Sequence, residues 1–215
     1  TRLHVLHLTT EKELSLLQAG KLADKQITGE ACVHHLFFSE EDYEVKGALI
    51  KCNPAIKKAT DRQALLQAVR DDVIDVVATD HAPHTWDEKQ NSYFKAPAGL
   101  PLVQHALISM LEHHHRGLLS LEQIVQKTSH NVAELFQIAE RGYIREGYWA
   151  DLVLVDLDAP TVVDEQKLYS KCGWSPFSGY IFKSSIVATL VNGEMAFENG
   201  EVNPNIRGKR IAFNR

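Results

Sequence analysis

Three short runs of mostly apolar residues, separated by helical patterns, constrain the fold of this 215-residue chain most strongly. The runs are Leu3–Leu8, Gln26–Val33 and Asp75–Thr79. Apolar residues recur on one helical face over Asp61–Val69, between the last two runs. Strands that alternate with helices at this spacing predict βα units and a parallel sheet or barrel. The first run is apolar enough to predict a strand buried deep inside such a fold.

The second half of the chain has a different pattern. A helix is predicted from Pro101 to about Gly117, followed by two short helices with Ser120 and Asn131 as N-caps. Beyond residue 140, glycines separate short β-rich runs, which predict an antiparallel appendage. These runs are Leu152–Val155, Ile186–Val191 and Met195–Phe197. The sequence therefore predicts an α/β part over residues 1–140 and a β-rich part over residues 141–215.

Composition excludes several classes of protein. The formal net charge of −5 argues against a general nucleic-acid binder, and 44% hydrophobic residues exceed what a disordered chain contains. No run approaches the roughly 18 apolar residues of a membrane span. The three cysteines are widely spaced and fit neither a disulfide framework nor a cysteine zinc cage. A reducing, cytoplasmic location is therefore expected.

Two strand ends carry residues that suit metal chemistry. Asp80 follows the run Asp75–Thr79, and His7 lies near the end of the first run. The carboxyl ends of strands form the active-site face of a β/α barrel, so two ligand types at equivalent ends favour a metal site. The alternatives are that Asp80 caps the next element and that His7 is a satisfied core or loop histidine.

Several segments carry a resemblance to class I dihydroorotases. The sequence ATDHAPH at Ala78–His84 matches the motif that these enzymes have after a barrel strand, and it is the most specific of the matches. A tail segment, Tyr148–Leu154, is similar to a motif of the wider amidohydrolase superfamily. The other similar segments are Leu6–Thr10, Glu30–Leu36, Lys51–Pro54, Ala98–Leu100 and Ser175–Gly179.

This resemblance implies a fold and an activity. The fold would be the C-terminal part of an amidohydrolase-type (β/α)8 TIM barrel with a small β-rich tail domain. Residues 1–140 would supply the C-terminal half of the metal-dependent barrel, and residues 141–215 the β-rich C-terminal part of a composite tail domain. The activity would be the zinc-dependent, reversible cyclisation of N-carbamoyl-L-aspartate to L-dihydroorotate in pyrimidine biosynthesis.

The resemblance also implies roles for individual residues. His7 and Asp80 would be zinc ligands, and Asp80 would also be the catalytic proton carrier. Positions that match substrate contacts are Asn53, His84, Ala98 and Gly99. A complete site would hold two zinc ions, with further ligands upstream of this chain. We therefore expect a piece of a longer polypeptide, or association with a missing N-terminal half, and a homodimer.

Some positions depart from the family pattern or leave alternatives open. The usual proline is absent before His34, where Cys32–Val33 stands. Glu30 would touch an extra metal or, as the favoured alternative, make a structural hydrogen bond. The run His113–His115 is predicted to be a solvated helix end. Two other functions stay open: a hydantoinase or allantoinase, and a non-catalytic dihydroorotase-like scaffold subunit.

Overall fold

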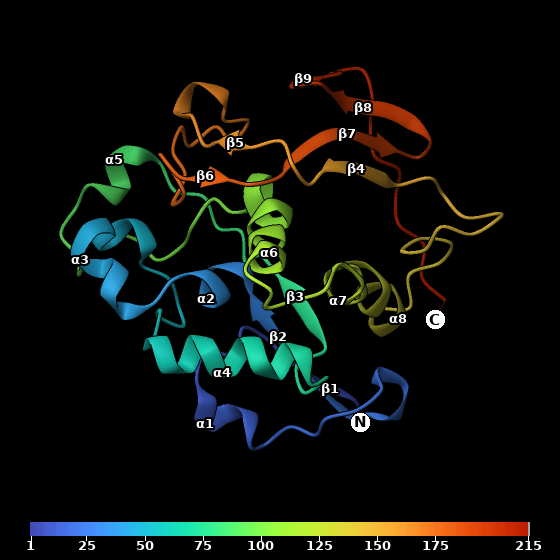
Figure 1. Cartoon of the computed structure of the whole chain (residues 1–215), viewed down its shortest axis with the longest axis horizontal. Coiled ribbons are helices and arrows are strands. Elements are labelled where there is room, and N and C mark those ends of the chain that lie inside the picture. The colour runs from blue at the N-terminus through green and yellow to red at the C-terminus, as the bar shows by residue number, and fades with distance from the viewer. Residues whose placement is uncertain (215) are drawn as a thin grey trace.

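A computed structural model describes residues 1–214, with strands and helices in the predicted alternation (Figure 1). The strands are β1 (Leu3–Val5), β2 (Ile27–Cys32), β3 (Val76–Ala78), β4 (Leu152–Asp156), β5 (Thr161–Val162), β6 (Ile181–Phe182), β7 (Ser185–Val191), β8 (Glu194–Glu198) and β9 (Glu201–Val202). The helices are α1 (Glu11–Leu14), α2 (Val33–Phe37), α3 (Tyr43–Lys46), α4 (Ala59–Arg70), α5 (Trp86–Lys89), α6 (Ala106–His115), α7 (Leu121–Val125) and α8 (Asn131–Leu135). None of the helices in this part of the chain has the length and apolar character needed to cross a membrane.

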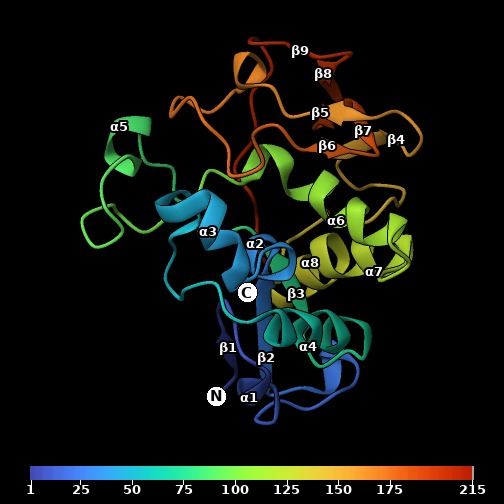
Figure 2. The ribbon, with the colours of Figure 1, turned by 60° about the vertical axis from the view of Figure 1, so that its left-hand side comes forward.

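The first three strands form a parallel sheet in the order β1-β2-β3, as the strand–helix alternation predicts. Leu3 pairs with Ile27, and Glu30 pairs with Val76, so β2 lies in the middle. Helices α4, α6 and α7 lie on one side of this sheet (Figure 2). Because the strands are parallel, their carboxyl ends meet at one edge, where the loops that follow β1, β2 and β3 converge.

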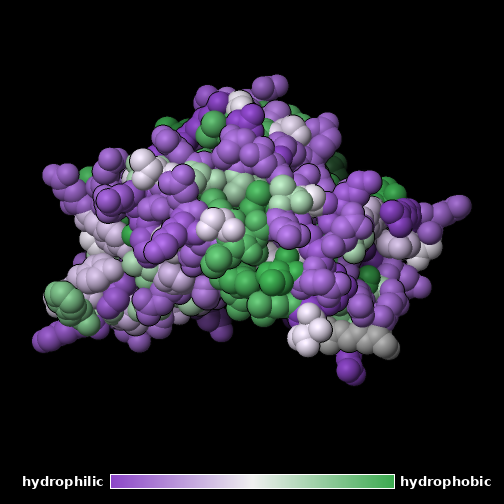
Figure 3. Space-filling model, turned by 90° about the horizontal axis from the view of Figure 1, so that it is seen from below, coloured by the Kyte–Doolittle hydropathy of each residue, from purple (hydrophilic) through white to green (hydrophobic). Residues whose placement is uncertain are grey.

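The prediction that the first strand is deeply buried is wrong for the chain by itself. Leu3 and Leu6 are 54% and 53% exposed. The reason is that β1 pairs with β2 along one edge and with no other strand of residues 1–214. Apolar surface also gathers in one area of the face that lies at the bottom of Figure 1 (Figure 3). A sheet with an open edge and uncovered apolar side chains is a surface suited to pairing.

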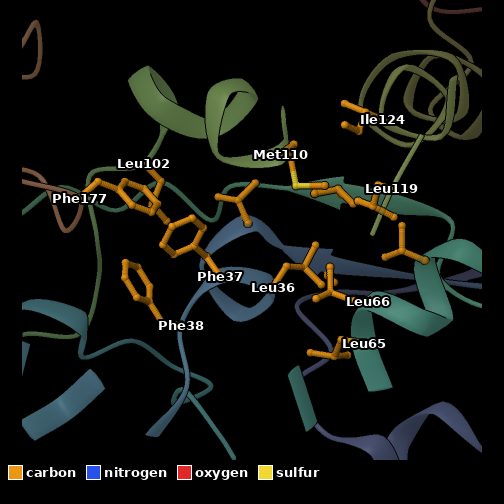
Figure 4. Close-up of a cluster of buried hydrophobic side chains, with 14 of the residues drawn as sticks. Leu36, Phe37, Phe38, Leu65, Leu66, Leu102, Met110, Leu119, Ile124 and Phe177 are labelled. Atoms are coloured by element: carbon orange, nitrogen blue, oxygen red, sulfur yellow. The ribbon is translucent and has the colours of Figure 1, made fainter. Parts of the chain in front are cut away.

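The hydrophobic core fills the space between the parallel sheet and its helices. Leu65 and Leu66 of α4 contact a cluster that includes Met110 of α6 and Ile124 of α7 (Figure 4). Burial of side chains of this size stabilises the fold by about 1.5–3 kcal/mol each. The helices are therefore held to the sheet mainly by apolar packing.

The β-rich segment beyond residue 140 has the predicted antiparallel pairing, in the order β4-β7-β8-β9. It shares the core of the α/β part. The ring of Phe37 on α2 lies 5.0 Å from that of Phe177 and 6.1 Å from that of Phe182, measured between centroids. Both phenylalanines are almost fully buried. Apolar packing thus joins the residues on either side of position 140.

Of the two predicted N-caps, one is confirmed and the other is wrong. Ser120 caps α7, as expected, and its side chain accepts a hydrogen bond from the Gln123 amide. Asn131 does not cap a helix, because a π-helical turn over Gln126–His130 joins α7 to α8 without a break. The Asn131 side chain instead donates to the Asp75 carbonyl at 2.7 Å. Its role is to tie α8 to the segment that precedes β3.

Candidate functional site

The loop after β3 presents Asp80, whose carboxylate has no hydrogen-bond partner among residues 1–214. Asp80 is exposed and has a left-handed backbone with φ of 46°. Its carboxylate makes no hydrogen bond or ion pair with any other described residue. The cap of the next helix, α5, is Thr85 in a reciprocal capping box with Glu88. The alternative in which Asp80 caps the following element is therefore wrong.

His7 occupies the equivalent place after β1. It is half-buried, its φ is 40°, and its ring makes no hydrogen bond within the described residues. A left-handed backbone is uncommon outside glycine, and such strain persists where the surrounding structure enforces it. The strand order places the end of β2 between His7 and Asp80. His34, which follows β2, is near enough to His7 for the two rings to interact electrostatically.

A second group of predicted residues lies together where His84, just before α5, meets the Ala98–Gly99 segment between α5 and α6. His84 Nε2 is 3.1 Å from the Ala98 carbonyl. Gly99 has φ of 141°, and a Cβ at this position would come within 2.5 Å of the Ala82 carbonyl oxygen and 3.0 Å of the His84 ring. Only glycine therefore allows the chain to approach His84 so closely. The structure brings His84, Ala98 and Gly99 into one contact group.

Two lysines hold this segment against the strand-end loops. Lys89 is 1% exposed, and its ammonium donates to the Lys51, Pro97 and Gly99 carbonyls at 3.3, 2.9 and 3.0 Å. Lys51 donates through its own Nζ to the Tyr93 and Ala96 carbonyls, both at 2.7 Å. Burial lowers the pKa of Lys89 to about 8.

Asn53 is two residues beyond Lys51 and is exposed. The Gly99 amide donates to the Lys51 carbonyl at 2.9 Å, which joins the Asn53 loop to the Ala98–Gly99 loop. The Trp174 indole donates to the His84 carbonyl at 2.7 Å. The sequence identified Asn53 but not the residues that hold its loop. Lys89 lies shortly after the ATDHAPH segment in the sequence, but its position alone does not indicate that it holds this loop.

Three histidines, His4, His113 and His81, make contacts that bear on the sequence predictions. Glu30 makes the favoured structural contact, because its carboxylate lies 3.1 Å from His4 Nε2. The prediction of a solvated terminus at His113–His115 is wrong for His113, which is 1% exposed and faces the core. Burial lowers the pKa of His113 to about 4. His81, missed by the sequence reasoning, uses Nδ1 to accept the Leu102 amide at 2.9 Å.

Parallel strands with helices on one side, and polar side chains at the strand ends that no other described residue binds, are typical of α/β proteins whose site lies at the carboxyl ends of the strands. Its family follows from comparison with known sequences. The chain belongs to the amidohydrolase family, whose sequence model matches residues 7–196.

Curated relatives and solved structures agree with this assignment. The chain is 38% identical over 200 residues to a dihydroorotase of Halobacterium salinarum, covering 93% of this chain and 46% of the relative. It is 34% identical to a dihydroorotase of Pyrococcus furiosus, covering 97% and 48%. The sequence resemblance to dihydroorotases is thereby confirmed. The chain spans about half the length of the curated relatives that it matches.

Structural comparison finds the same superfamily. An L-hydantoinase from Arthrobacter aurescens superposes with a TM-score of 0.88 at 29% identity, covering 94% of this chain and 46% of that one. A D-hydantoinase structure superposes with a TM-score of 0.84 at 25% identity, covering 94% and 46%. The fold is thus shared with cyclic amidases as well as with the dihydroorotase relatives.

Proposed function

We propose that this chain forms the C-terminal part of a zinc-dependent dihydroorotase, which interconverts N-carbamoyl-L-aspartate and L-dihydroorotate. Its three parallel strands would belong to a (β/α)8 barrel, with the antiparallel sheet in a tail domain. The observation that carries the proposal is the loop after β3. There Asp80, whose carboxylate no other described residue binds, precedes by four positions His84, which contacts the Ala98–Gly99 loop. The names and identities of the dihydroorotase relatives support it.

The residues at the strand ends fit a zinc site. His7 and Asp80 offer an imidazole and a carboxylate, which are common zinc ligands, and neither side chain is occupied by another described residue. A catalytic zinc usually has about three protein ligands, so His7 and Asp80 by themselves are too few for two ions. The remaining ligands would come from other barrel strands. Bound zinc would supply Lewis-acid polarisation of the amide carbonyl and acidification of water.

The chain's own residues would then divide the remaining work. Asp80 would carry a proton between the attacking water and the ring nitrogen that leaves. Asn53 and His84 would bind the carboxylate and ring edges of the substrate, which is anionic in both directions of the reaction. The Ala98–Gly99 backbone would cover the ring, and the Lys51 and Lys89 contacts would fix its position.

A hydantoinase is the second candidate, favoured by the structural neighbours. The two candidates differ in the substrate. Hydantoin rings lack the carboxylate that dihydroorotate carries, so residues placed for a carboxylate favour dihydroorotate. A non-catalytic scaffold is the third candidate. Such subunits lose metal ligands, whereas this chain retains His7 and Asp80, the two ligands that the resemblance implies.

A chimera tests the proposal. The chain would replace the matching 46% of the Halobacterium salinarum dihydroorotase. We expect dihydroorotate hydrolysis and no comparable hydantoin hydrolysis, with activity lost in the Asp80→Asn form. A folded, zinc-loaded chimera that hydrolyses hydantoin but not dihydroorotate would support the second candidate, and one that hydrolyses neither would support the scaffold. The homodimer, the cytoplasmic location and the domain division near residue 140 stay predictions.

A further inference from the structure

The imidazole of His81, the residue directly after Asp80, accepts two backbone amides from a distant part of the chain. Its Nδ1 lies 2.9 Å from the amide nitrogen of Leu102 and 3.2 Å from that of Val103. Because a backbone amide can only donate, Nδ1 must offer its lone pair to both. In the neutral ring, Nε2 then carries the proton. The geometry therefore sets the tautomer of His81.

The two amides lie at the start of the helical run that leads into α6. A 3₁₀ turn over Val103–His105 precedes α6, and the first amides of such a run have no carbonyl of their own helix to bind. A Ser, Thr, Asp or Asn at the N-cap usually binds them. Within residues 1–214, the N-cap residues Leu102 and His105 supply no such side-chain hydrogen bond. His81 supplies the acceptor instead, from 21 positions upstream of Leu102.

The backbone next to this imidazole is tied to the same segment. The Ala82 amide donates to the Leu100 carbonyl at 3.1 Å, and His81 forms a parallel β-bridge with Leu100. Gly99 packs against Ala82 so closely that a Cβ at Gly99 would lie 2.5 Å from the Ala82 carbonyl oxygen. The loop that carries Asp80 is therefore fixed, on its C-terminal side, to the segment that leads into α6.

This anchoring bears on Asp80, whose carboxylate has no hydrogen-bond partner among the described residues. Its φ of 46° is left-handed, and a strained backbone of this kind persists where surrounding contacts enforce it. Inside the loop, the His81 amide donates to Thr79 Oγ1 at 3.3 Å. The bridge from His81 Nδ1 to Leu102 and Val103 reaches outside the loop, so it can fix the loop relative to the rest of the fold.

We propose that His81 is a positioning residue for Asp80. By accepting the Leu102 and Val103 amides, its Nδ1 holds the loop after β3 in the conformation that presents the Asp80 carboxylate at the strand ends. This inference rests on the proposed dihydroorotase function and deepens it. His81 acts through the backbone of Asp80 and through the neighbouring Gly99 segment, and it contacts neither zinc nor substrate.

Two variants of similar shape separate the acceptor from the bulk of the side chain. His81→Asn keeps an oxygen acceptor bonded to Cγ, where histidine has Nδ1, and His81→Leu replaces that atom with a methyl group. In the 215-residue chain, we expect hydrogen exchange at the Leu102 and Val103 amides to accelerate at least about fivefold in His81→Leu and less than about twofold in His81→Asn.

The conformation of Asp80 is measured in the same samples. The nuclear Overhauser effect between its amide and Hα protons is strong at positive φ, so it should weaken in His81→Leu and persist in His81→Asn. Equal exchange rates in the two variants, together with an unchanged Overhauser effect at Asp80, overturn the proposal.

Turnover in the chimera with the Halobacterium salinarum enzyme tests the link to catalysis. His81→Leu should lower kcat for dihydroorotate at least about tenfold with a smaller change in KM, and His81→Asn should keep kcat within about threefold of the unaltered chimera. A kcat loss of the same size in both variants overturns the role of the acceptor. An inactive unaltered chimera contradicts the dihydroorotase function instead, and the exchange and Overhauser measurements then decide the role of His81.

The unsubstituted chain decides the matter if His81→Leu does not fold. Proton–nitrogen correlation spectra should show an unprotonated Nδ1 and a protonated Nε2 in His81. His114 is the internal control, because its Nδ1 lies 3.1 Å from the Leu119 carbonyl, which can only accept, so this ring should show the opposite tautomer. A protonated Nδ1 in His81 overturns the proposal.

Discussion

Replacing Lys89 with methionine should destabilise the chain by removing the cation that joins the strand-end loops. Lys89→Met keeps most of the apolar stem and deletes three donors. The Lys51 carbonyl keeps the Gly99 amide as a partner, whereas the Pro97 and Gly99 carbonyls lose their donor. Two unpaired acceptors cost about 1–3 kcal/mol each. The variant also removes the cost of burying the Lys89 charge, which offsets part of this effect. We therefore expect the free energy of unfolding to fall by about 2–4 kcal/mol.

Urea unfolding followed by tryptophan fluorescence measures this loss. The Trp174 ring centroid lies 5.7 Å from the Lys89 ammonium, so its emission reports on this region. Lys95→Met is the matched control, because Lys95 is exposed on the same segment and its side chain has no hydrogen-bond partner within the described residues. A midpoint shift in Lys89→Met no larger than in Lys95→Met refutes the role of Lys89. An equally large fall in the free energy of unfolding in both variants refutes this role as well.

Four further predictions concern catalysis and pH. In the chimera, Asp80→Asn should nearly abolish dihydroorotate turnover while circular dichroism stays unchanged; activity within a few-fold of the unaltered chimera contradicts the proton-carrier role. His84→Ala or Asn53→Ala should lower kcat/KM by about 1.5–3 kcal/mol without loss of zinc, measured by atomic emission beside the kinetics; zinc loss in either variant means that the residue is a ligand. The 215-residue chain alone should not hydrolyse dihydroorotate, because it offers too few zinc ligands at His7 and Asp80; full activity of the purified chain would show that other histidines serve. Burial lowers the pKa of His35, His105 and His113 to about 4 from 6.5, so between these pH values the unfolded chain binds more protons and stability falls with falling pH; urea titrations at several pH values should show a slope approaching about 4 kcal/mol per pH unit, and a flat profile refutes the burial of these rings.

The sequence was sufficient for elements set by local pattern. The alternation of strands and helices predicted the parallel sheet, and capping chemistry at Ser120 placed the start of α7. The sequence was insufficient where contacts between distant residues decide the position of a side chain. Asn131 has the residue type of an N-cap, but a carbonyl 56 positions away binds its side chain. The His113–His115 run is polar by composition, yet packing turns His113 into the core.

The candidate site shows the same division. Asp80 and His84 could be found because the ATDHAPH motif is contiguous. The lysine contacts could not, because Lys51 and Lys89 meet the 93–99 segment only after the chain folds back. The sequence shows only that Cys32, His34 and His35 are near one another in the chain. Their burial, and the lack of a described partner for both His34 ring nitrogens, are properties of the packed structure alone.

The ring contacts of Phe37 with Phe177 and Phe182 limit how this chain can be recombined. A gene fusion that exchanged residues beyond 140 for an unrelated cap would leave Phe37 and Phe38 facing water or a badly matched surface. Phe38 stacks on Phe177 at 5.2 Å, so the loss would include both rings. Natural or engineered exchange of the residues beyond 140 should therefore succeed only when the segment that carries Phe177 and Phe182 is kept together with α2.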